Sequence, residues 1–193
     1  MRPPFILASS SPRRLALLGQ IGIVPDQVVS PDINETPHKG EVPRAYALRM
    51  AEEKARAALA HHAGSIILAC DTTVATGRRI IGEAPQSDAD VALALGHLSG
   101  RRHHVYSAVA VVDASGQLRT RLSDTVIQFK RLSALEIANY VASGEGHGKA
   151  GGYAIQGRAA AFVLRMAGSY SGVVGLPLYE TSALLKTASV IDG

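Results

Sequence analysis

Two arginines follow a short run of serines near the start of the chain. Residues 9–14 read SSSPRR and come directly after the apolar residues 5–8. Serine and proline suit the cap and first position of a helix, and backbone N–H groups at a helix start bind phosphate. Arg13 and Arg14 would add bidentate donors, although cations there oppose the helix dipole. We interpret this turn as a phosphate site, with a capped helix carrying two solvated arginines as the alternative.

Carboxylates occur at two further places where a sheet protein collects ligands. Asp32 and Glu35 share one polar loop, and Asp71 ends an apolar run that predicts a buried strand. Hydrolysis of a phosphoanhydride bond usually needs Mg²⁺ or Mn²⁺ held by a few carboxylates, and a base for the attacking water. The alternatives stay open: Asp71 could be a turn residue bonded to its own backbone, and the other two could be solvated.

A glycine-rich segment lies at residues 144–157 and contains Lys149 and Gln156. Its spacing partly matches a dinucleotide-binding fingerprint, but it follows a predicted helix where that motif requires a strand. It also lacks the Ser or Thr of a P-loop. So many glycines indicate close backbone approach to a ligand, or a mobile loop. A second motif, residues 168–172, has tyrosine where a nucleophile elbow needs serine, which argues against serine-hydrolase chemistry.

The composition limits the class of protein. The chain has 193 residues, 47% hydrophobic and 19% charged, with a net charge of +4. We expect one globular domain over residues 1–193 that attracts anions. Aromatic residues are 5% without tryptophan, so nucleic acid is not the expected partner. Apolar runs are too short for a membrane span or signal peptide, so we expect a cytoplasmic protein.

Metal ligands of the nitrogen and sulfur type are not expected. Cys70 is the single cysteine, so it can form neither an intrachain disulfide nor a cysteine-based zinc site, and it should be a small buried residue. The paired histidines at 61–62 and 103–104 are neighbours in sequence, and neighbours on a helix or strand point to different faces. A histidine metal site is therefore improbable.

The elements that must position these residues alternate between strands and helices. We predict strands over residues 5–9, 27–30, 65–69, 72–76, 79–81, 103–113, 118–130 and 160–166. We predict helices over residues 12–22, 42–62, 87–98, 133–144 and 178–186, the first with Leu15, Leu18 and Ile21 inward. The strands at 103–113 and 118–130 should form a hairpin. The order favours an α/β fold with a mixed twisted sheet and flanking helices.

Taken together, these segments resemble the Maf family of nucleotide pyrophosphatases. The resemblance covers nearly the whole chain, in order: LASSSPRR at 7–14, DINET at 32–36, EKA at 53–55, CDTTV at 70–74, LSGRRHHVYSAV at 98–109, KAGGYAIQG at 149–157 and GSYSGVVGLPLYET at 168–181. Each segment alone is a weak signal, but the ordered set is specific.

The resemblance implies an elongated fold of the Maf and inosine-triphosphatase type, with two lobes around a central cleft, and a homodimer. It implies hydrolysis of a nucleoside triphosphate to the monophosphate and pyrophosphate, dependent on Mg²⁺ or Mn²⁺. By position, the resemblance implies Asp71 as the proton acceptor, with Glu35 and Lys54 as further catalytic residues. It implies Glu35 and Asp71 as the metal ligands. It implies that the phosphates are bound by Ser9, Arg13, Arg14 and Lys149.

Substrate preference within the family also leaves a trace in the sequence. The branch acting on dTTP and UTP carries arginine, threonine and glutamine at three positions, which are Arg13, Thr72 and Gln156 here. The branch acting on 7-methyl-GTP carries tryptophan, glutamine and glutamate instead. The amide of Gln156 offers both a donor and an acceptor to a uracil or thymine edge, which an ionised glutamate cannot. The resemblance therefore implies dTTP, UTP and modified pyrimidine nucleotides as substrates.

One segment departs from the family. Members usually have a lysine close to a proline after the hairpin that follows Asp71, whereas residues 81–85 read IGEAP, which places Glu83 or Ala84 there. Loss of a cation that stabilises transition-state charge can cost a few kcal/mol. This departure and the basic net charge motivate one alternative, a catalytically weakened regulator of cell division that binds a nucleotide or nucleic acid. A separate alternative is a relative that acts on a different base, a 7-methyl-GTP pyrophosphatase.

Overall fold

Seven strands form one twisted, mixed sheet in the computed structural model, which describes residues 2–82 and 85–191. The strands are β1 Phe5–Ala8, β2 Gln27–Val29, β3 Ile66–Thr76, β4 Arg79–Ile80, β5 Arg102–Val112, β6 Leu118–Phe129 and β7 Val163–Ala167. Their order is β2-β1-β3-β5-β6-β7, and β4 pairs with β3. β1 runs parallel to β2 and β3, and the remaining pairs are antiparallel. The predicted mixed α/β fold is confirmed.

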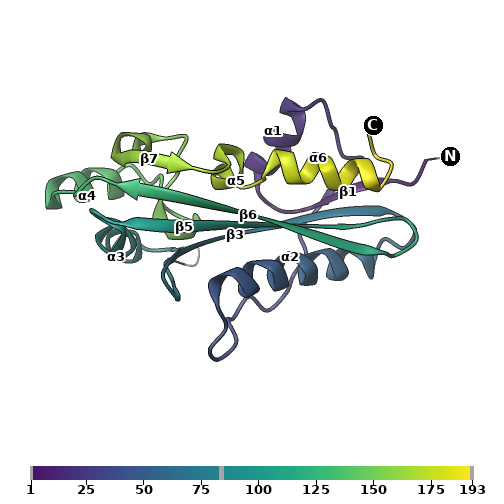
Figure 1. The fold of residues 1–193 in the computed structure, drawn as a ribbon, viewed down its shortest axis with the longest axis horizontal. Coiled ribbons are helices and arrows are strands. Elements are labelled where there is room, and N and C mark those ends of the chain that lie inside the picture. Colours follow the sequence, from purple (N-terminus) through teal and green to yellow (C-terminus); the bar gives the residue numbers. More distant parts are fainter. Residues whose placement is uncertain (1, 83–84, 192–193) are drawn as a thin grey trace.

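Helices cover both faces of this sheet, which gives an elongated molecule (Figure 1). They are α1 Pro12–Gln20, α2 Pro43–Leu59, α3 Asp88–Leu98, α4 Ala134–Val141, α5 Tyr170–Val174 and α6 Leu178–Thr187, with 3₁₀ turns at Ala150–Gly152 and Arg158–Phe162. β3, β5 and β6 run along the long axis and connect the two ends (Figure 1). Within the described ranges, no helix is long and apolar enough to cross a membrane.

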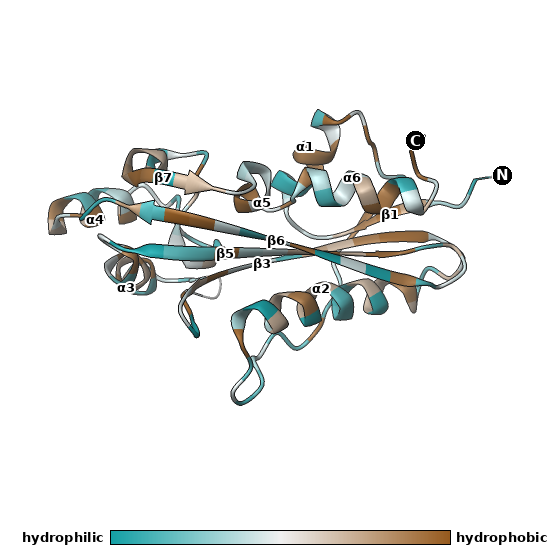
Figure 2. Ribbon diagram, viewed as in Figure 1, coloured by the Kyte–Doolittle hydropathy of each residue, from teal (hydrophilic) through white to brown (hydrophobic). Residues whose placement is uncertain are grey.

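The end that contains both termini is buried on both faces. Successive residues of a strand face opposite sides, so Leu68 and Cys70 pack under α1 and α6, whereas Ile67 and Ala69 pack under α2. The contact face of α2 consists of buried alanines at positions 47, 51, 55 and 58. Figure 2 shows hydrophobic and hydrophilic bands alternating along this helix, as expected for a helix with one face on the sheet.

The other end has its own core, packed between α3, α4 and the 3₁₀ turns. His103 is fully buried in this region, with its ring edge-on to Phe129 at 4.9 Å and to Tyr153 at 5.6 Å between centroids. Its Nε2 lies 2.9 Å from the Tyr153 hydroxyl, while Nδ1 has no partner among the described residues. Burial, and next the charge of His104, lower the pKa of His103 to about 4.

Strand predictions were wrong at two places. Residues 65–69 and 72–76 are not separate strands, because β3 pairs with β5 without a break from Ile67 to Ala75. Asp71 therefore lies within a strand and not at its end, since the partner strand continues past the polar residues. The predicted strand at 160–166 corresponds to β7, but residues Arg158–Phe162 form a 3₁₀ turn first.

Two helix predictions also need correction. Of the residues predicted to face inward, Leu18 is buried but Leu15 and Ile21 are exposed. Leu17 is buried in their place, so the buried face of α1 is rotated relative to the predicted one. The short helix α5 was not predicted, because glycine and two valines within its five residues give a poor helix signal. It begins where the Ser169 hydroxyl accepts a hydrogen bond from the Gly172 N–H at 3.0 Å.

Burial of His103 predicts a pH-dependent stability. Its pKa is about 4 in the folded protein and 6.5 in the unfolded chain, so the unfolded chain binds more protons between those values. Stability should be fullest above pH 6.5 and fall as pH drops toward 4, by up to about 3 kcal/mol from this residue. Urea unfolding at several pH values measures it. His103→Leu should flatten this slope, whereas His61→Leu at an exposed position should not.

Candidate active site

A cavity of about 660 Å³ lies beside β3, where the two ends of the molecule meet. β1 pairs with β3 only as far as Ala69, and β4 joins the same edge at Ala75. Between these points, no other strand of the described chain covers that edge. The cavity fills this gap, and its walls come from the start of α1, the loop before α2, α2 itself, the glycine-rich segment and α5.

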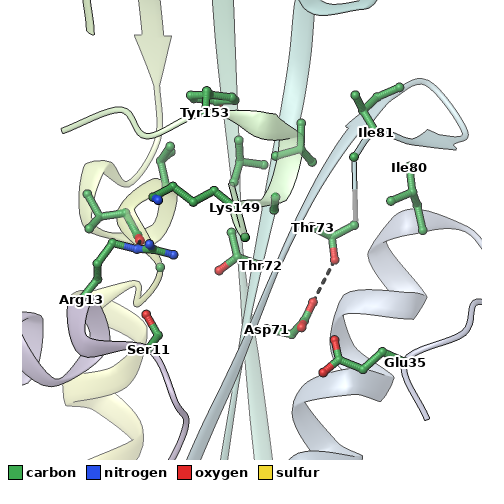
Figure 3. A pocket seen from close by; sticks show the side chains of 18 of the residues that line it. Ser11, Arg13, Glu35, Asp71, Thr72, Thr73, Ile80, Ile81, Lys149 and Tyr153 are labelled. Carbon is green, nitrogen blue, oxygen red and sulfur yellow. Dashed lines mark hydrogen bonds between the residues drawn. The ribbon is translucent and has the colours of Figure 1, made fainter. Parts of the chain in front are cut away.

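Alternation along β3 sorts the cavity into two sides. Asp71 and Thr73 point to the face covered by α2, and Thr72 points to the face of α1 and α5. Figure 3 shows Glu35 beside Asp71, whereas Arg13 and Lys149 lie across the strand on the side of Thr72. An acidic side and a cationic side therefore face each other across one strand.

On the acidic side, a single lysine joins both carboxylates. Lys54 Nζ lies 2.9 Å from Asp71 Oδ1 and 3.1 Å from Glu35 Oε1. The Thr73 hydroxyl donates to Asp71 Oδ2 at 2.9 Å, which occupies the second carboxylate oxygen (Figure 3). The Asp71 side chain is 9% exposed and that of Glu35 is 55% exposed. Asp71 is therefore the fixed member of the pair, and Glu35 is the accessible one.

On the cationic side, backbone carbonyls orient two guanidinium groups. Arg13 Nε donates to the Val174 carbonyl at 3.2 Å, and Arg14 Nε donates to the Gly175 carbonyl at 2.8 Å. These carbonyls end α5, where the helix dipole is negative and attracts cations. Burial, and then the charge of Arg14, lower the pKa of Arg13. The carbonyls of α5 thus account for two arginines in the first turn of α1.

Arg14 also links the start of α1 to β3. Its Nη1 donates to Ser9 Oγ at 3.0 Å, and its Nη2 lies 3.5 Å from Thr72 Oγ1. Ser9 is buried and does not line the cavity, so its contact is with Arg14 and not with the open space. Of the predicted phosphate-binding turn, Arg13 and Arg14 line the cavity, whereas Ser9 holds the Arg14 guanidinium from behind.

The glycine-rich segment packs closely on β3. Gly151 has a φ of +72°, and a Cβ at this position would lie 2.9 Å from the Val74 side chain. Its N–H donates to the carbonyls of Ile81 and Gly82 at 3.1 and 2.9 Å. Glycine is required here by packing within the protein. The segment contributes two of the predicted site residues, Lys149 and Gln156, to the cavity lining.

Most of the predicted site residues line this cavity. They are Arg13, Arg14, Glu35, Lys54, Asp71, Thr72, Lys149 and Gln156. Asp32 is exposed and does not line it, so it remains a loop residue. The sequence reasoning missed Thr73, whose only signal was its place two residues after Asp71 on one strand face. Glu83 and Ala84, where the family lysine is expected, lie outside the described residues.

The donors on the acidic side fit a shared metal site. Within residues 2–82 and 85–191, no three His, Cys, Asp or Glu side chains are grouped to hold a metal ion by themselves. Mg²⁺ commonly takes one or two carboxylates and completes its shell with waters and substrate phosphates. Asp71 and Glu35, joined through Lys54, supply two such oxygens. The arrangement therefore fits a cation that a phosphate ligand helps to bind.

The fold resembles that of a solved structure, and the sequence matches a family model. A HAM1 protein from Coxiella burnetii has a similar fold, with a TM-score of 0.50 at 18% identity, over 97% of this chain and 100% of that chain. The sequence model of the family described as Maf-like protein matches residues 4–188. The chain belongs to the Maf family.

Two relatives cover almost the whole chain. A protein of Sphingopyxis alaskensis named dTTP/UTP pyrophosphatase is 56% identical over 188 residues, which are 97% of this chain and 98% of that protein. A protein of Novosphingobium aromaticivorans with the same name is 55% identical over 188 residues, which are 97% of this chain and 93% of that protein.

The ion pair between Lys54 and Asp71 predicts strong energetic coupling. Because both side chains are largely buried, Lys54→Met should lower the free energy of unfolding by about 3 kcal/mol, mainly by leaving Asp71 unpaired. Asp71→Asn in the same chain should recover part of this loss. Urea unfolding of both single variants and the double variant measures the coupling. Additive effects would contradict the pairing.

Proposed function

We propose that this chain hydrolyses dTTP and UTP, and modified pyrimidine nucleotides, to the monophosphate and pyrophosphate. The observation that carries the proposal is the division of one cavity into an acidic side and a cationic side across β3. Relatives that share 55–56% of residues over nearly the whole chain, and that are named for this activity, support it.

The cations of the cavity suit a triphosphate. Arg13, Arg14 and Lys149 line one side, and their charges would neutralise the phosphate oxygens as negative charge shifts to the leaving pyrophosphate. Burial, and then the charge of Arg13, lower the pKa of Lys149. An anionic ligand would relieve the repulsion among these groups, so the site is electrostatically prepared for phosphate.

The acidic side suits activation of water. Asp71, as a carboxylate, would accept a proton from a water molecule while the water oxygen bonds to phosphorus and the α–β phosphoanhydride bond breaks. Lys54 and Thr73 fix its two oxygens, so its orientation is set before substrate binds. Asp71 and Glu35 would hold Mg²⁺ or Mn²⁺, which supplies positive charge to the phosphates when bound.

The preference for pyrimidines is proposed to lie with the remaining polar groups of the cavity. Thr72 and Gln156 both line it, and Thr72 lies on the side of Arg13 (Figure 3). The Gln156 amide can donate to a carbonyl and accept from the ring N–H of uracil or thymine. Cytosine lacks that ring N–H and should bind less well. A homodimer and a cytoplasmic location stay predictions from the sequence, and light scattering of the purified protein tests the first.

Replacement of the proposed base tests the function. Asp71→Asn should lower kcat for dTTP by about 100- to 10,000-fold, because general-base catalysis is lost. Pyrophosphate release with saturating Mg²⁺ or Mn²⁺ measures it. Asp32→Asn removes an exposed acid outside the cavity and is the matched control, which should keep full turnover. Full turnover by Asp71→Asn would refute the assignment.

A substrate panel separates the alternatives. The same assay should show dTTP and UTP hydrolysed faster than CTP, GTP and 7-methyl-GTP. Preference for 7-methyl-GTP would favour the other branch of the family. Nucleotide binding without pyrophosphate release from any substrate would instead favour the regulatory protein.

A further inference from the structure

Glu35 lies in a segment without regular secondary structure, inside a short turn in which the Thr36 N–H donates to Asn34 Oδ1 at 2.9 Å. It lies in residues 30–42, which join β2 to α2 without a helix or strand. Its side chain is more than half exposed and reaches Lys54 at 3.1 Å. A carboxylate in such a segment would sample many positions unless the backbone is fixed from outside. The structure supplies that fixation from α2.

Two side chains of α2 hold the backbone around Glu35. The Tyr46 hydroxyl donates to the Glu35 carbonyl at 2.7 Å. Arg49 Nη2 donates to the next carbonyl, that of Thr36, at 3.2 Å. Further along the segment, the His38 N–H donates to Glu41 Oε2 at 2.9 Å. Glu41 in turn pairs with Arg49 of α2, so the segment is attached to the helix both before and after the turn at residues 39–40.

Arg49 is the centre of these contacts. Its Nε and Nη2 both lie 2.7 Å from the two oxygens of Glu41, and its Nη1 lies 3.2 Å from Glu53. The side chains of Arg49 and Glu41 are only 18% and 10% exposed. The guanidinium also lies over the Tyr46 ring, 5.5 Å from its centroid. This bidentate geometry needs a planar guanidinium, which lysine cannot replace.

The Arg49–Glu41 pair remains charged well below neutral pH. The hydrogen bonds from Arg49 lower the pKa of Glu41 to about 2, against the opposing effect of burial. Both partners are thus ionised above about pH 3, so titration of Glu41 does not alter these contacts near neutral pH. Neither side chain lines the cavity, so neither is used directly in the proposed reaction.

We infer that Arg49, clamped by Glu41, is the positioning residue that sets where Glu35 stands relative to Asp71. The same helix carries Lys54, which pairs with Asp71 at 2.9 Å and with the Glu35 side chain. α2 therefore holds this region at three points: Tyr46 binds the Glu35 carbonyl, Arg49 binds the next carbonyl, and Lys54 binds the Glu35 side chain. This inference rests on the proposed function, because it assigns Glu35 and Asp71 to one metal.

Loss of the clamp should affect the acidic side alone. Arg13, Arg14 and Lys149 are held by α5 and the glycine-rich turn, with no contact to Arg49. The nucleotide KM at saturating metal should therefore change little, whereas metal affinity should fall. Supporting contacts behind metal ligands typically contribute about 10- to 100-fold to metal affinity.

The test is Arg49→Lys, which keeps the charge and removes the fork. Mn²⁺ binding in the presence of a saturating dTTP analogue with a non-hydrolysable α–β bridge, measured by electron paramagnetic resonance, should weaken by about 10-fold or more. Glu53→Gln is the matched control, because Glu53 shares the same guanidinium but has no contact with the segment around Glu35. It should bind Mn²⁺ within about twofold of the unaltered protein, since an exposed pair contributes little.

A second variant distinguishes positioning from general damage. In a Glu35→Gln background, Arg49→Lys should cause almost no further loss of Mn²⁺ affinity, because both changes act through one carboxylate. Full additivity of the two changes, or unchanged Mn²⁺ affinity in Arg49→Lys, would overturn the inference. If Arg49→Lys does not fold, Glu41→Gln removes the same clamp and is judged by the same two criteria.

A different result would refute the proposed function. An unaltered protein that binds Mn²⁺ but releases no pyrophosphate from dTTP or UTP would refute the activity. Mn²⁺ binding by the Arg49 variant would still decide whether Arg49 positions Glu35.

Discussion

The difference in length between β1 and β3 determines where a ligand can bind in this protein. β1 has four residues and β3 has eleven, so β3 continues well beyond the end of its parallel neighbour. The chain leaves β1 directly into α1, whose first residues lie at the uncovered edge. β4 covers only the far end of that edge. The gap between them is a cavity, and four successive residues of β3, 71–74, line it from alternate faces.

The small side chains on the buried face of α2 also shape the cavity. Alanines at 47, 51, 55 and 58 form the buried face, so the helix lies close to the sheet. At this short separation Lys54 reaches Asp71 directly, although the lysine sits on the helix flank and the aspartate on a strand. Larger residues on that face would move the helix outward and lengthen the ion pair. Packing and electrostatics are therefore linked in one element.

Much of this arrangement was predictable from the sequence, and the failures have physical causes. The β5–β6 hairpin and the helix predicted from residue 133 depend on local signals, and both were found. The position of Asp71 was misjudged because a polar Asp-Thr-Thr run reads as a strand end, whereas the paired strand β5 keeps it extended. The contacts of Arg13 and Arg14 with the carbonyls at the end of α5 were missed because the paired residues are 161 positions apart in the chain.

The long strands also limit how the cavity can change shape. In proteins with two separate domains, a cleft closes by rotation about a few hinge residues. Here β3, β5 and β6 run through both ends, so rotation of one end relative to the other would have to bend or twist these paired strands. The width of the opening therefore depends on the shape of these three strands. Adaptation to ligands of different size falls to the separate wall elements, which can diverge in sequence while the strand that carries Asp71 stays in place.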